Sequence, residues 1–319
     1  MKSTLILIIL VVIFKSQIVR TQFCFTYPDP WTNVRIYFYH GDENLQNVSY
    51  QLKDANQLLE NADFNIEHIT TLYVHGYSET QERYSIPTLK RAYSYRKNYN
   101  FITLDYASYC NRDIALAYPR AVNAVSYLTP FVSQALIKLF NAGLPIEKFH
   151  LIGHSIGGQF VGYIGRNIIA QTNGTKILNR ISSLDPAYPG FSSFSFMETI
   201  SSNDAKFVDV IHTDAYIFGA PVQTGSVDFW PNGGKALQPG CPPLNLLTPD
   251  PNDFCSHWRS WKYWAESVAN LYPEKFVAYK ANTYSEFLTR PLSFYQTNEI
   301  TLMGLQAPRR QIIYQFLFF

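Results

Sequence analysis

The sequence predicts an α/β fold with a mainly parallel central sheet flanked by helices, because short β-rich runs alternate with longer helical patterns. The β-rich runs are residues 34–40, 70–74, 101–106, 149–152, 181–184 and 207–211. The helical patterns are residues 121–140, 159–170 and 258–271. Strands separated by helices are typical of βαβ units, which build parallel sheets.

The composition is that of one packed domain. Of the 319 residues, 47% are hydrophobic and 16% are charged, which argues against a disordered chain. The net charge is only +2 and the basic residues are scattered, so we expect no nucleic-acid partner. The sequence shows no repeat and no linker rich in Gly, Ser or Pro, and we expect a single domain over residues 22–319.

Residues 1–21 have the features of a secretory signal peptide. Lys2 precedes an apolar run over residues 4–14, which is too short to span a bilayer comfortably. Cleavage after Ser16 or after Thr21 fits the pattern, and a signal anchor or a buried first strand is the alternative. No other segment approaches about 18 uninterrupted apolar residues, so we expect a secreted, extracellular protein without a transmembrane segment after cleavage.

The cysteines predict disulfides, since their count is even and the predicted route is secretory. They are Cys24, Cys110, Cys241 and Cys255. Three pairings are possible, and the spacing does not resemble a zinc site, so we expect no metal. Asn47 and Asn173 begin acceptor sequons for glycosylation on the secretory route.

Residues 228–251 are dense in Pro, Gly and Asn and predict an extended loop. The loop contains Cys241 and ends close to Cys255. Loops longer than about 12 to 15 residues are usually functional or disordered, and a disulfide here favours a function. We interpret this loop as a lid or a substrate-binding rim.

Residues 153–158, with the sequence GHSIGG, contain a GxSxG motif. A predicted strand runs into the motif and a helical pattern runs out of it, which is the context of a nucleophile elbow. Glycines suit such a turn because its backbone is strained and its helix packs close to the strand. A plain glycine-rich turn is the alternative, but the flanking elements favour Ser155 as a nucleophile.

A serine nucleophile needs a base, and the base needs an acid that fixes its tautomer. In hydrolases with this elbow, the chain order is Ser, then the acid, then His. His212 and His257 are the histidines that follow Ser155. His212 lies in or at the end of a predicted strand, where a structural role is expected. His257 lies in a loop before a helix and near Cys255, so we predict it as the base.

Asp185 is the predicted acid because it ends the strand at residues 181–184, on the sheet edge where α/β proteins bind ligands. Pro186 then turns the chain away from the sheet. For the other aspartates that precede His257 we expect roles in turns, caps or surface charge. These are Asp204, Asp209, Asp214 and Asp228.

Backbone N–H groups must stabilise the oxyanion of an acyl transfer. The first donor should be Ile156, which follows the nucleophile. The second should come from an early strand-to-helix loop, and residues 75–77 follow the predicted strand 70–74. Gly76 permits a tight turn there, so we predict the N–H of Tyr77 as the second donor; ordinary loop packing is the alternative.

Through these residues the sequence resembles the pancreatic lipase family over most of the chain. The resemblance lies in six blocks: 75–77 (HGY), 153–158 (GHSIGG), 183–187 (SLDPA), 210–214 (VIHTD), 228–234 (DFWPNGG) and 255–260 (CSHWRS). It implies an α/β-hydrolase fold, the triad Ser155, Asp185 and His257, and the oxyanion donors Tyr77 and Ile156. It also implies the disulfides Cys24–Cys110 and Cys241–Cys255, the second of which brackets the lid.

The sequence also departs from the digestive triglyceride lipases of that family, which have a longer lid and a further β-sandwich domain. Only 13 residues separate Cys241 from Cys255, and the loop over residues 214–228 is short. Both features resemble the phospholipase A1 branch, including its small insect and venom members. We expect a single catalytic domain without a C-terminal β-sandwich domain.

The C-terminal part differs as well. Ala281 stands where many relatives have a further cysteine, which implies that a third disulfide is absent. The apolar ending, residues 312–319, predicts a terminal strand that covers the core. Docking of this ending on a membrane surface is the alternative.

The predicted function is that of a secreted serine hydrolase that cleaves carboxylic esters of lipids through an acyl-enzyme. Phospholipase A1 activity is preferred because a short lid leaves room for bulky headgroups, and triacylglycerol lipase activity is the alternative. A non-catalytic, yolk-type lipid-binding or storage protein is the alternative of another class, disfavoured by the intact triad. The mechanism needs no cofactor, and the expected partner is a lipid ester at a membrane or lipid surface.

Overall fold

The structure is a computed structural model that describes residues 26–41, 46–110, 117–192, 197–243, 251–269, 276–294, 296–308 and 314–318. The predicted signal peptide, residues 1–21, lies outside these ranges. Among the helices within them, none combines the length and the apolar character of a bilayer-spanning segment.

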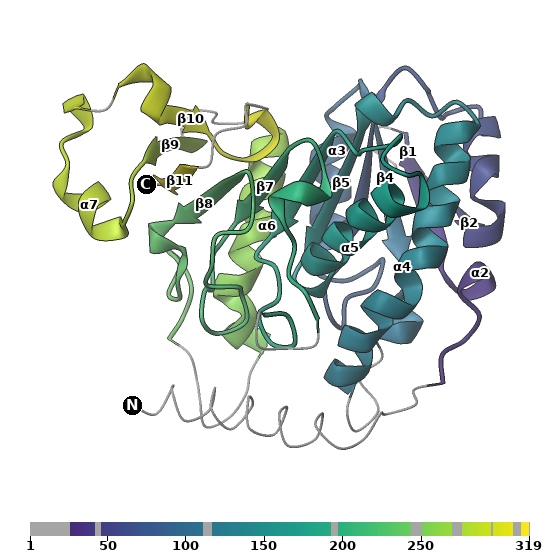
Figure 1. Ribbon diagram of the computed structural model, residues 1–319, viewed down its shortest axis with the longest axis horizontal. Helices are drawn as coiled ribbons and strands as arrows, with labels where there is room; N and C mark the ends of the chain where they lie inside the picture. The colour runs from purple at the N-terminus through teal and green to yellow at the C-terminus, as the bar shows by residue number, and fades with distance from the viewer. Residues whose placement is uncertain are drawn as a thin grey trace.

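A sheet of eleven described strands forms the centre of the molecule, in the order β10-β9-β11-β8-β7-β6-β5-β3-β4-β1-β2 (Figure 1). Neighbours from β4 to β11 run parallel, whereas β1, β2, β9 and β10 pair antiparallel at the two ends. The strands are β1 Arg35–His40, β2 Gln46–Gln51, β3 Ile69–Val74, β4 Tyr99–Asp105, β5 Phe149–His154, β6 Arg180–Leu184, β7 Val208–Ile211, β8 Val227–Pro231, β9 Val277–Lys280, β10 Ile300–Leu302 and β11 Tyr314–Phe318.

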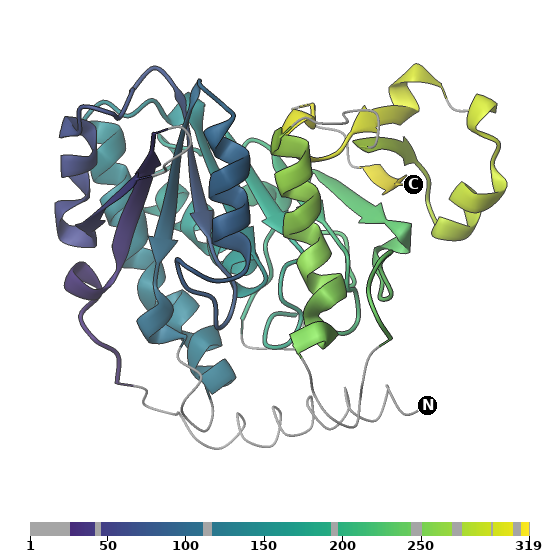
Figure 2. The ribbon, with the colours of Figure 1, turned by 180° about the vertical axis from the view of Figure 1, so that it is seen from behind.

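Helices cover both faces of this sheet. On the face nearest the viewer in Figure 1, α4 (Ala117–Asn141) packs against α5 (Ile156–Gln171). On the other face, seen in Figure 2, α3 (Ser85–Ser94) packs against α6 (Cys255–Ala269). The predicted α/β class with a mainly parallel sheet is therefore confirmed.

Two shorter helices lie outside these layers. The helix α2 (Pro30–Asn33) lies near the start of the described chain. The helix α7 (Tyr284–Thr289) belongs to a small C-terminal lobe that projects beyond β9 and β10 (Figure 1).

The core follows from this layering, because a parallel sheet covered on both faces buries successive side chains on opposite sides. All residues of β5 are buried. Leu151 joins the apolar cluster under α4 and α5, whereas its neighbour Ile152 joins the cluster under α3 and α6. The run of apolar residues in β5 is thus explained by burial on both faces.

The strand β8 corrects the prediction of a continuous loop over residues 228–251. Residues Val227–Pro231 form a fully buried strand parallel to β7. Asp228, the charged residue of this strand, satisfies its carboxylate with hydrogen bonds inside the fold. The turn signal is correct only from residues 232–234 onward, where Gly233 and Gly234 have positive φ.

The C-terminal strand β11 confirms the predicted terminal strand. It pairs parallel to β8 and antiparallel to β9, so the ending of the chain is part of the central sheet. This pairing joins the C-terminal lobe to the sheet.

Candidate active site

Ser155 lies at a sharp turn between β5 and α5, with φ 57° and ψ −123°. Residues other than glycine rarely adopt this backbone conformation, and such strain persists mainly where function needs it. The turn also requires glycines, because a Cβ on Gly153 would lie 2.1 Å from the carbonyl oxygen of Gly157. This is the geometry of a nucleophile elbow at the carboxyl end of a parallel strand.

Asp185 follows β6, the strand next to β5, and has a φ of 46°. Its Oδ1 accepts the N–H of Thr213 at 2.8 Å and the N–H of Asp214 at 3.2 Å. Gly219 packs against the same carboxylate, since a Cβ there would come within 2.3 Å of Oδ1. These contacts bury the carboxylate and fix its orientation.

His257 lies in the first turn of α6, and its Nδ1 is 2.6 Å from Oδ2 of Asp185. Because the carboxylate accepts, Nδ1 carries the proton and Nε2 keeps its lone pair, as a general base requires. Burial lowers the pKa of His257 below the ordinary histidine value, and the hydrogen bond with Asp185 opposes this effect. The imidazole is therefore neutral and available as a base near neutral pH.

Ser155 is close to both residues through its neighbours in the chain. Its N–H donates to the carbonyl oxygen of Leu184 at 3.1 Å, and Asp185 follows Leu184. The ring of His154, the residue before Ser155, has its centroid 4.6 Å from that of His257. The structure thus gathers the three predicted residues at one edge of the sheet, although they are separated by up to 102 positions in sequence.

The predicted oxyanion loop, residues 75–77, follows β3 and lies against the nucleophile. A Cβ on Gly76 would be 3.0 Å from the Cβ of Ser155, so only glycine allows this approach. The ring of His75 stacks on that of Tyr106, whose hydroxyl donates to the carbonyl oxygen of His75 at 2.7 Å. The loop that carries the predicted donor Tyr77 therefore packs on Tyr106 and lies beside Ser155.

The second predicted donor, Ile156, is the first residue of α5 and is fully buried. Its N–H belongs to the first turn of that helix, where backbone N–H groups have no partner within the helix. Such groups, together with the helix dipole, favour a developing negative charge.

His212 has the structural role that its position predicts. Its ring is fully buried and stacks on Trp230 with centroids 3.8 Å apart. The two ring nitrogens lie 2.9 Å from the carbonyl oxygen of Ala220 and 2.7 Å from Oδ1 of Asp228. Asp228 is occupied in the same contact, so neither residue faces Ser155 as a base or an acid.

The aspartates expected in turns, caps or surface charge divide into two groups. Asp204 closes a capping box around the short 3-10 helix Ser202–Asp204 and also binds Arg166, which fits a cap. Asp209 is instead a fully buried residue of β7 and forms a bidentate pair with Arg180. The expectation was wrong for Asp209 because the buried arginine that neutralises it is 29 positions away in sequence.

Asp214 begins a turn, as expected, because its carbonyl oxygen accepts the N–H groups of Ile217 and Gly219. Its side chain is nevertheless fully buried beside Asp185 rather than exposed as a surface charge. Burial, and then the charge of Asp185, raise the pKa of Asp214 well above the usual carboxyl range. Asp214 is therefore a neutral carboxylic acid near neutral pH, and it adds no second negative charge to the site.

Ligand-type atoms of Asp185, Asp214 and His257 lie within 4.8 Å of one another, which is close enough to be compared with a metal site. The short hydrogen bond between His257 and Asp185 holds a proton between two of these three residues. A cation there would have to displace that proton. We therefore assign this cluster to proton transfer.

A buried pair of Glu79 and His154 was not predicted from the sequence. Oε1 of Glu79 lies 2.9 Å from Nδ1 of His154, and both side chains are 2% exposed. The sequence contains no signal for this pair, because the partners are 75 positions apart and neither lies in a recognised motif as an acid or a base.

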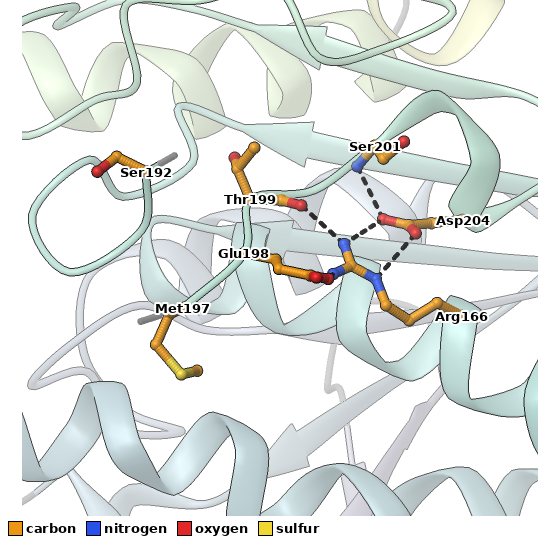
Figure 3. A pocket seen from close by; sticks show the side chains of 7 residues that line it. All are labelled: Arg166, Ser192, Met197, Glu198, Thr199, Ser201 and Asp204. Carbon is orange, nitrogen blue, oxygen red and sulfur yellow. Dashed lines mark hydrogen bonds and ion pairs between the residues drawn. The ribbon is translucent and has the colours of Figure 1, made fainter. Parts of the chain in front are cut away.

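A surface cavity of about 490 Å³ lies away from these residues, around Arg166 on α5 (Figure 3). Arg166 binds Asp204 at 2.9 Å and Glu198 at 2.7 Å, so its charge is already neutralised. It follows Ser155 by eleven positions, which corresponds to about 16 Å along a helix at about 1.5 Å per residue. We assign these contacts to attaching the loop after β6 to α5.

Of the two disulfides implied by the resemblance, Cys241–Cys255 is present, with its Cα atoms 5.6 Å apart. It links the loop after β8 to the start of α6, two positions before His257. Cys110 is buried and Cys24 lies outside the described residues, so the pair Cys24–Cys110 stays a prediction. The predicted lid falls partly outside them too, at residues 244–250.

The two predicted acceptor asparagines are exposed. Asn47 lies on the edge strand β2, and Asn173 lies in the turn after α5 with a φ of 47°. Both side chains are therefore accessible to a modifying enzyme, and glycosylation stays a prediction.

Comparison with known proteins gives the family. The family model described as Lipase matches residues 19–313 of the chain. A pancreatic triacylglycerol lipase from Cavia porcellus is 31% identical over 309 residues, covering 88% of this chain and 62% of the relative. Inactive pancreatic lipase-related protein 1 from Homo sapiens is 31% identical over 278 residues, covering 81% and 56%. The chain spans about six tenths of the length of these relatives.

With an α/β-hydrolase fold and a match along nearly its whole length, the chain belongs to the lipase family, the family of the pancreatic lipases and lipase-related proteins.

Proposed function

We propose that this protein is a secreted serine hydrolase that cleaves carboxylic esters of lipids with the triad Ser155, Asp185 and His257. The observation that carries the proposal is the 2.6 Å hydrogen bond between Asp185 and His257 beside the strained turn of Ser155. Family membership supports a lipid ester as the substrate class.

The reaction proceeds in two halves. Nε2 of His257 takes the proton of Ser155 as the hydroxyl attacks the ester carbonyl, and Asp185 stabilises the resulting imidazolium. The N–H groups of Tyr77 and Ile156 stabilise the tetrahedral oxyanion, each contributing about 2.7 to 4 kcal/mol in comparable sites. His257 then protonates the departing alcohol, and water hydrolyses the acyl-enzyme to release the fatty acid.

For the substrate, we propose phospholipids, cleaved as by a phospholipase A1. The support is the short segment of 13 residues between Cys241 and Cys255, which limits how far a lid can cover the cleft. Triacylglycerol is the second candidate, and it is favoured by the relatives whose names state that activity. A short rim fits bulky headgroups better than a long lid does.

A non-catalytic role is the competing proposal of another class, because one relative at 31% identity is named inactive. Family membership does not determine activity, and the site must be tested. The intact Ser155, Asp185 and His257 favour an enzyme.

The test compares the wild-type protein with Ser155→Ala on phosphatidylcholine vesicles and on triolein emulsion, with measurement of released fatty acid. We expect release from phosphatidylcholine, with lysophospholipid lacking the sn-1 chain, and a loss of about three orders of magnitude or more in the variant. Ser126→Ala, which changes an exposed serine of α4, serves as the matched control and should keep wild-type activity.

Three outcomes decide between the proposals. Equal background release by the wild type and Ser155→Ala would remove the enzymatic proposal. Release from triolein alone would overturn the phospholipid preference. A fluorophosphonate probe should label the wild type and the control at Ser155 and leave Ser155→Ala unlabelled.

A further inference from the structure

The buried carboxylate of Glu79 joins three parts of the fold that meet at Ser155. Its Oε1 accepts the N–H of Gly76 in the oxyanion loop at 3.3 Å and contacts Nδ1 of His154 at 2.9 Å. Its Oε2 accepts the N–H of Ser85, the first residue of α3, at 3.2 Å, and a second hydrogen bond from the Ser85 hydroxyl. One side chain thus binds a loop, a strand end and a helix start.

The contacts at Ser85 replace a conventional helix cap. The helix α3 begins after Tyr84, which has a φ of 59° and provides no side-chain cap, so Glu79 takes the place of the cap. A carboxylate at a helix N-terminus is stabilised by the helix dipole. Gly76 packs against Glu79, His154 and Ser155 with no space for a Cβ, so these side chains and the oxyanion loop are in direct contact.

We infer that Glu79 is a positioning residue for the proposed hydrolysis, because its carboxylate fixes the oxyanion loop relative to the nucleophile and holds the ring of His154 against that of His257. The inference rests on the proposed function. Glu79 acts through Gly76 and His154, and its role is to keep donors and base in the geometry that the transition state needs.

The charges of Glu79 and His154 also affect the pKa of His257, the proposed base. Charges that act on His257 come from Asp185, His154 and Glu79, and the neutral Asp214 lies beside them. Glu79 raises the pKa of His257, whereas His154 lowers it. Around Glu79 itself lie His154, His75, Tyr73 and Tyr106. Burial disfavours the charged form of Glu79, but the contacts with His154, His75 and Ser85 together lower its pKa.

Removing the charge of Glu79 should therefore move the pH dependence of the rate. Glu79→Gln removes a negative charge, so the pKa of His257 falls. The acid limb of the pH–rate profile, where activity is lost as His257 is protonated, therefore moves to lower pH. His154→Asn keeps a donor toward Glu79 but removes the ring that packs on His257, so kcat should fall. Glu79→Asp keeps the charge but shortens the side chain, so the limb stays near its wild-type position.

The experiment measures fluorophosphonate labelling of Ser155 and hydrolysis of a soluble p-nitrophenyl ester between pH 5 and 9. For Glu79→Gln and Glu79→Asp we expect kcat to fall about 10- to 100-fold, as in about 1 Å misplacements of a site, with KM within about twofold. Glu82→Gln is the matched control, since it changes an exposed carboxylate of the same loop. Thermal unfolding establishes that each variant is folded.

The outcomes separate this inference from the proposed function. If the wild type is active and labelled and Ser155→Ala is not, the proposed function holds whatever the Glu79 variants do. Folded Glu79→Gln with wild-type kcat and an unmoved acid limb would then overturn the inference alone. A merely structural role predicts lower stability and less active protein in all variants, with the acid limb of Glu79→Gln unmoved. If Glu79→Gln does not fold, the kcat of folded His154→Asn and Glu79→Asp decides, and wild-type values for both would overturn the inference.

Discussion

At the scale of single residues, two of the proposed catalytic residues have strained backbone conformations. Ser155 and Asp185 have φ values of 57° and 46°, in a region that costs a side chain about 1 to 3 kcal/mol. Both lie directly after buried parallel strands, where the surrounding hydrogen bonds hold them in place. The stability of the buried sheet offsets the cost of these two strained conformations.

Asp214 gives a prediction that depends on pH. The folded protein keeps its proton above the ordinary carboxyl pKa of about 4, whereas the unfolded chain has released it. Stability should therefore fall as the pH rises from about 4 toward the raised pKa, by at most about 1.4 kcal/mol per pH unit. Asp214→Asn cannot titrate and should remove this slope.

The measurement is urea unfolding of the wild type and Asp214→Asn at pH 5 and pH 8. The variant should gain stability relative to the wild type at the higher pH. Glu60→Gln, at an exposed carboxylate, is the control and should show no such gain. A wild-type-to-variant difference that is equal at both pH values would show that Asp214 is ionised in the folded protein.

The sequence predicts the triad residues but misses Glu79 and Asp214, for a physical reason. Ser155, Asp185 and His257 are marked by local features, namely a glycine turn, a strand end and a chain order. Glu79 and Asp214 acquire their properties only from burial against distant residues. A loop position in a single sequence does not reveal such burial.

At the scale of elements, predictability follows the environment of each strand. The parallel strands β3 to β7 are covered on both faces and appear as apolar runs in the sequence. The edge strand β2 is missed because it pairs with β1 alone, carries a polar sequence and is partly exposed. The strand β8 is missed because its Asp and Pro look like turn residues, although Asp228 is paired inside the sheet.

Helix α3 shows the same limit. Its sequence has no conventional N-cap, and Pro87 stands within its first turn. Its start is set by the side chain of Glu79, which is an interaction of the folded state. The helices α4, α5 and α6 are long and amphipathic or apolar, and were predicted to within four residues at each end.

The disulfide Cys241–Cys255 should stabilise the start of α6 and hence His257. A cross-link that closes a loop of about 15 residues contributes at most about 3 kcal/mol through the entropy of the unfolded chain. We expect the double variant Cys241→Ser with Cys255→Ser to lose up to this amount in urea unfolding and to have a lower kcat, since Cys255 is two positions from His257.

Reduction gives the control for this prediction. Dithiothreitol should remove the difference in stability between the wild type and the double variant, because it opens Cys241–Cys255 in the wild type and acts equally on the other cysteines of both proteins. An unreduced double variant with wild-type stability and kcat would show that the cross-link does not position α6.

At the scale of the whole molecule, one buried ion pair joins the central sheet to the segment that follows β10. Arg180 of β6 binds both oxygens of Asp209 on β7, at 2.8 and 2.9 Å. Its remaining N–H groups donate to the carbonyl oxygens of Gly304 and Leu305, which follow β10. The arginine therefore connects parts of the chain that are 124 and 125 positions apart in sequence.

Removing one partner of this pair should destabilise the protein more than any surface change. Asp209→Asn would leave Arg180 buried without its counter-charge, and such losses cost about 3 to 5 kcal/mol. Glu198→Gln is the matched control, because Glu198 is the exposed end of the Arg166 pair and its loss should cost less than about 1 kcal/mol. Both costs are to be measured as changes in the free energy of unfolding in urea at pH 7.

The double variant Arg180→Met with Asp209→Leu should recover part of the lost stability, since it removes the unpaired charge together with its partner. A cost below about 1 kcal/mol for Asp209→Asn would mean that water reaches Arg180 and screens its charge.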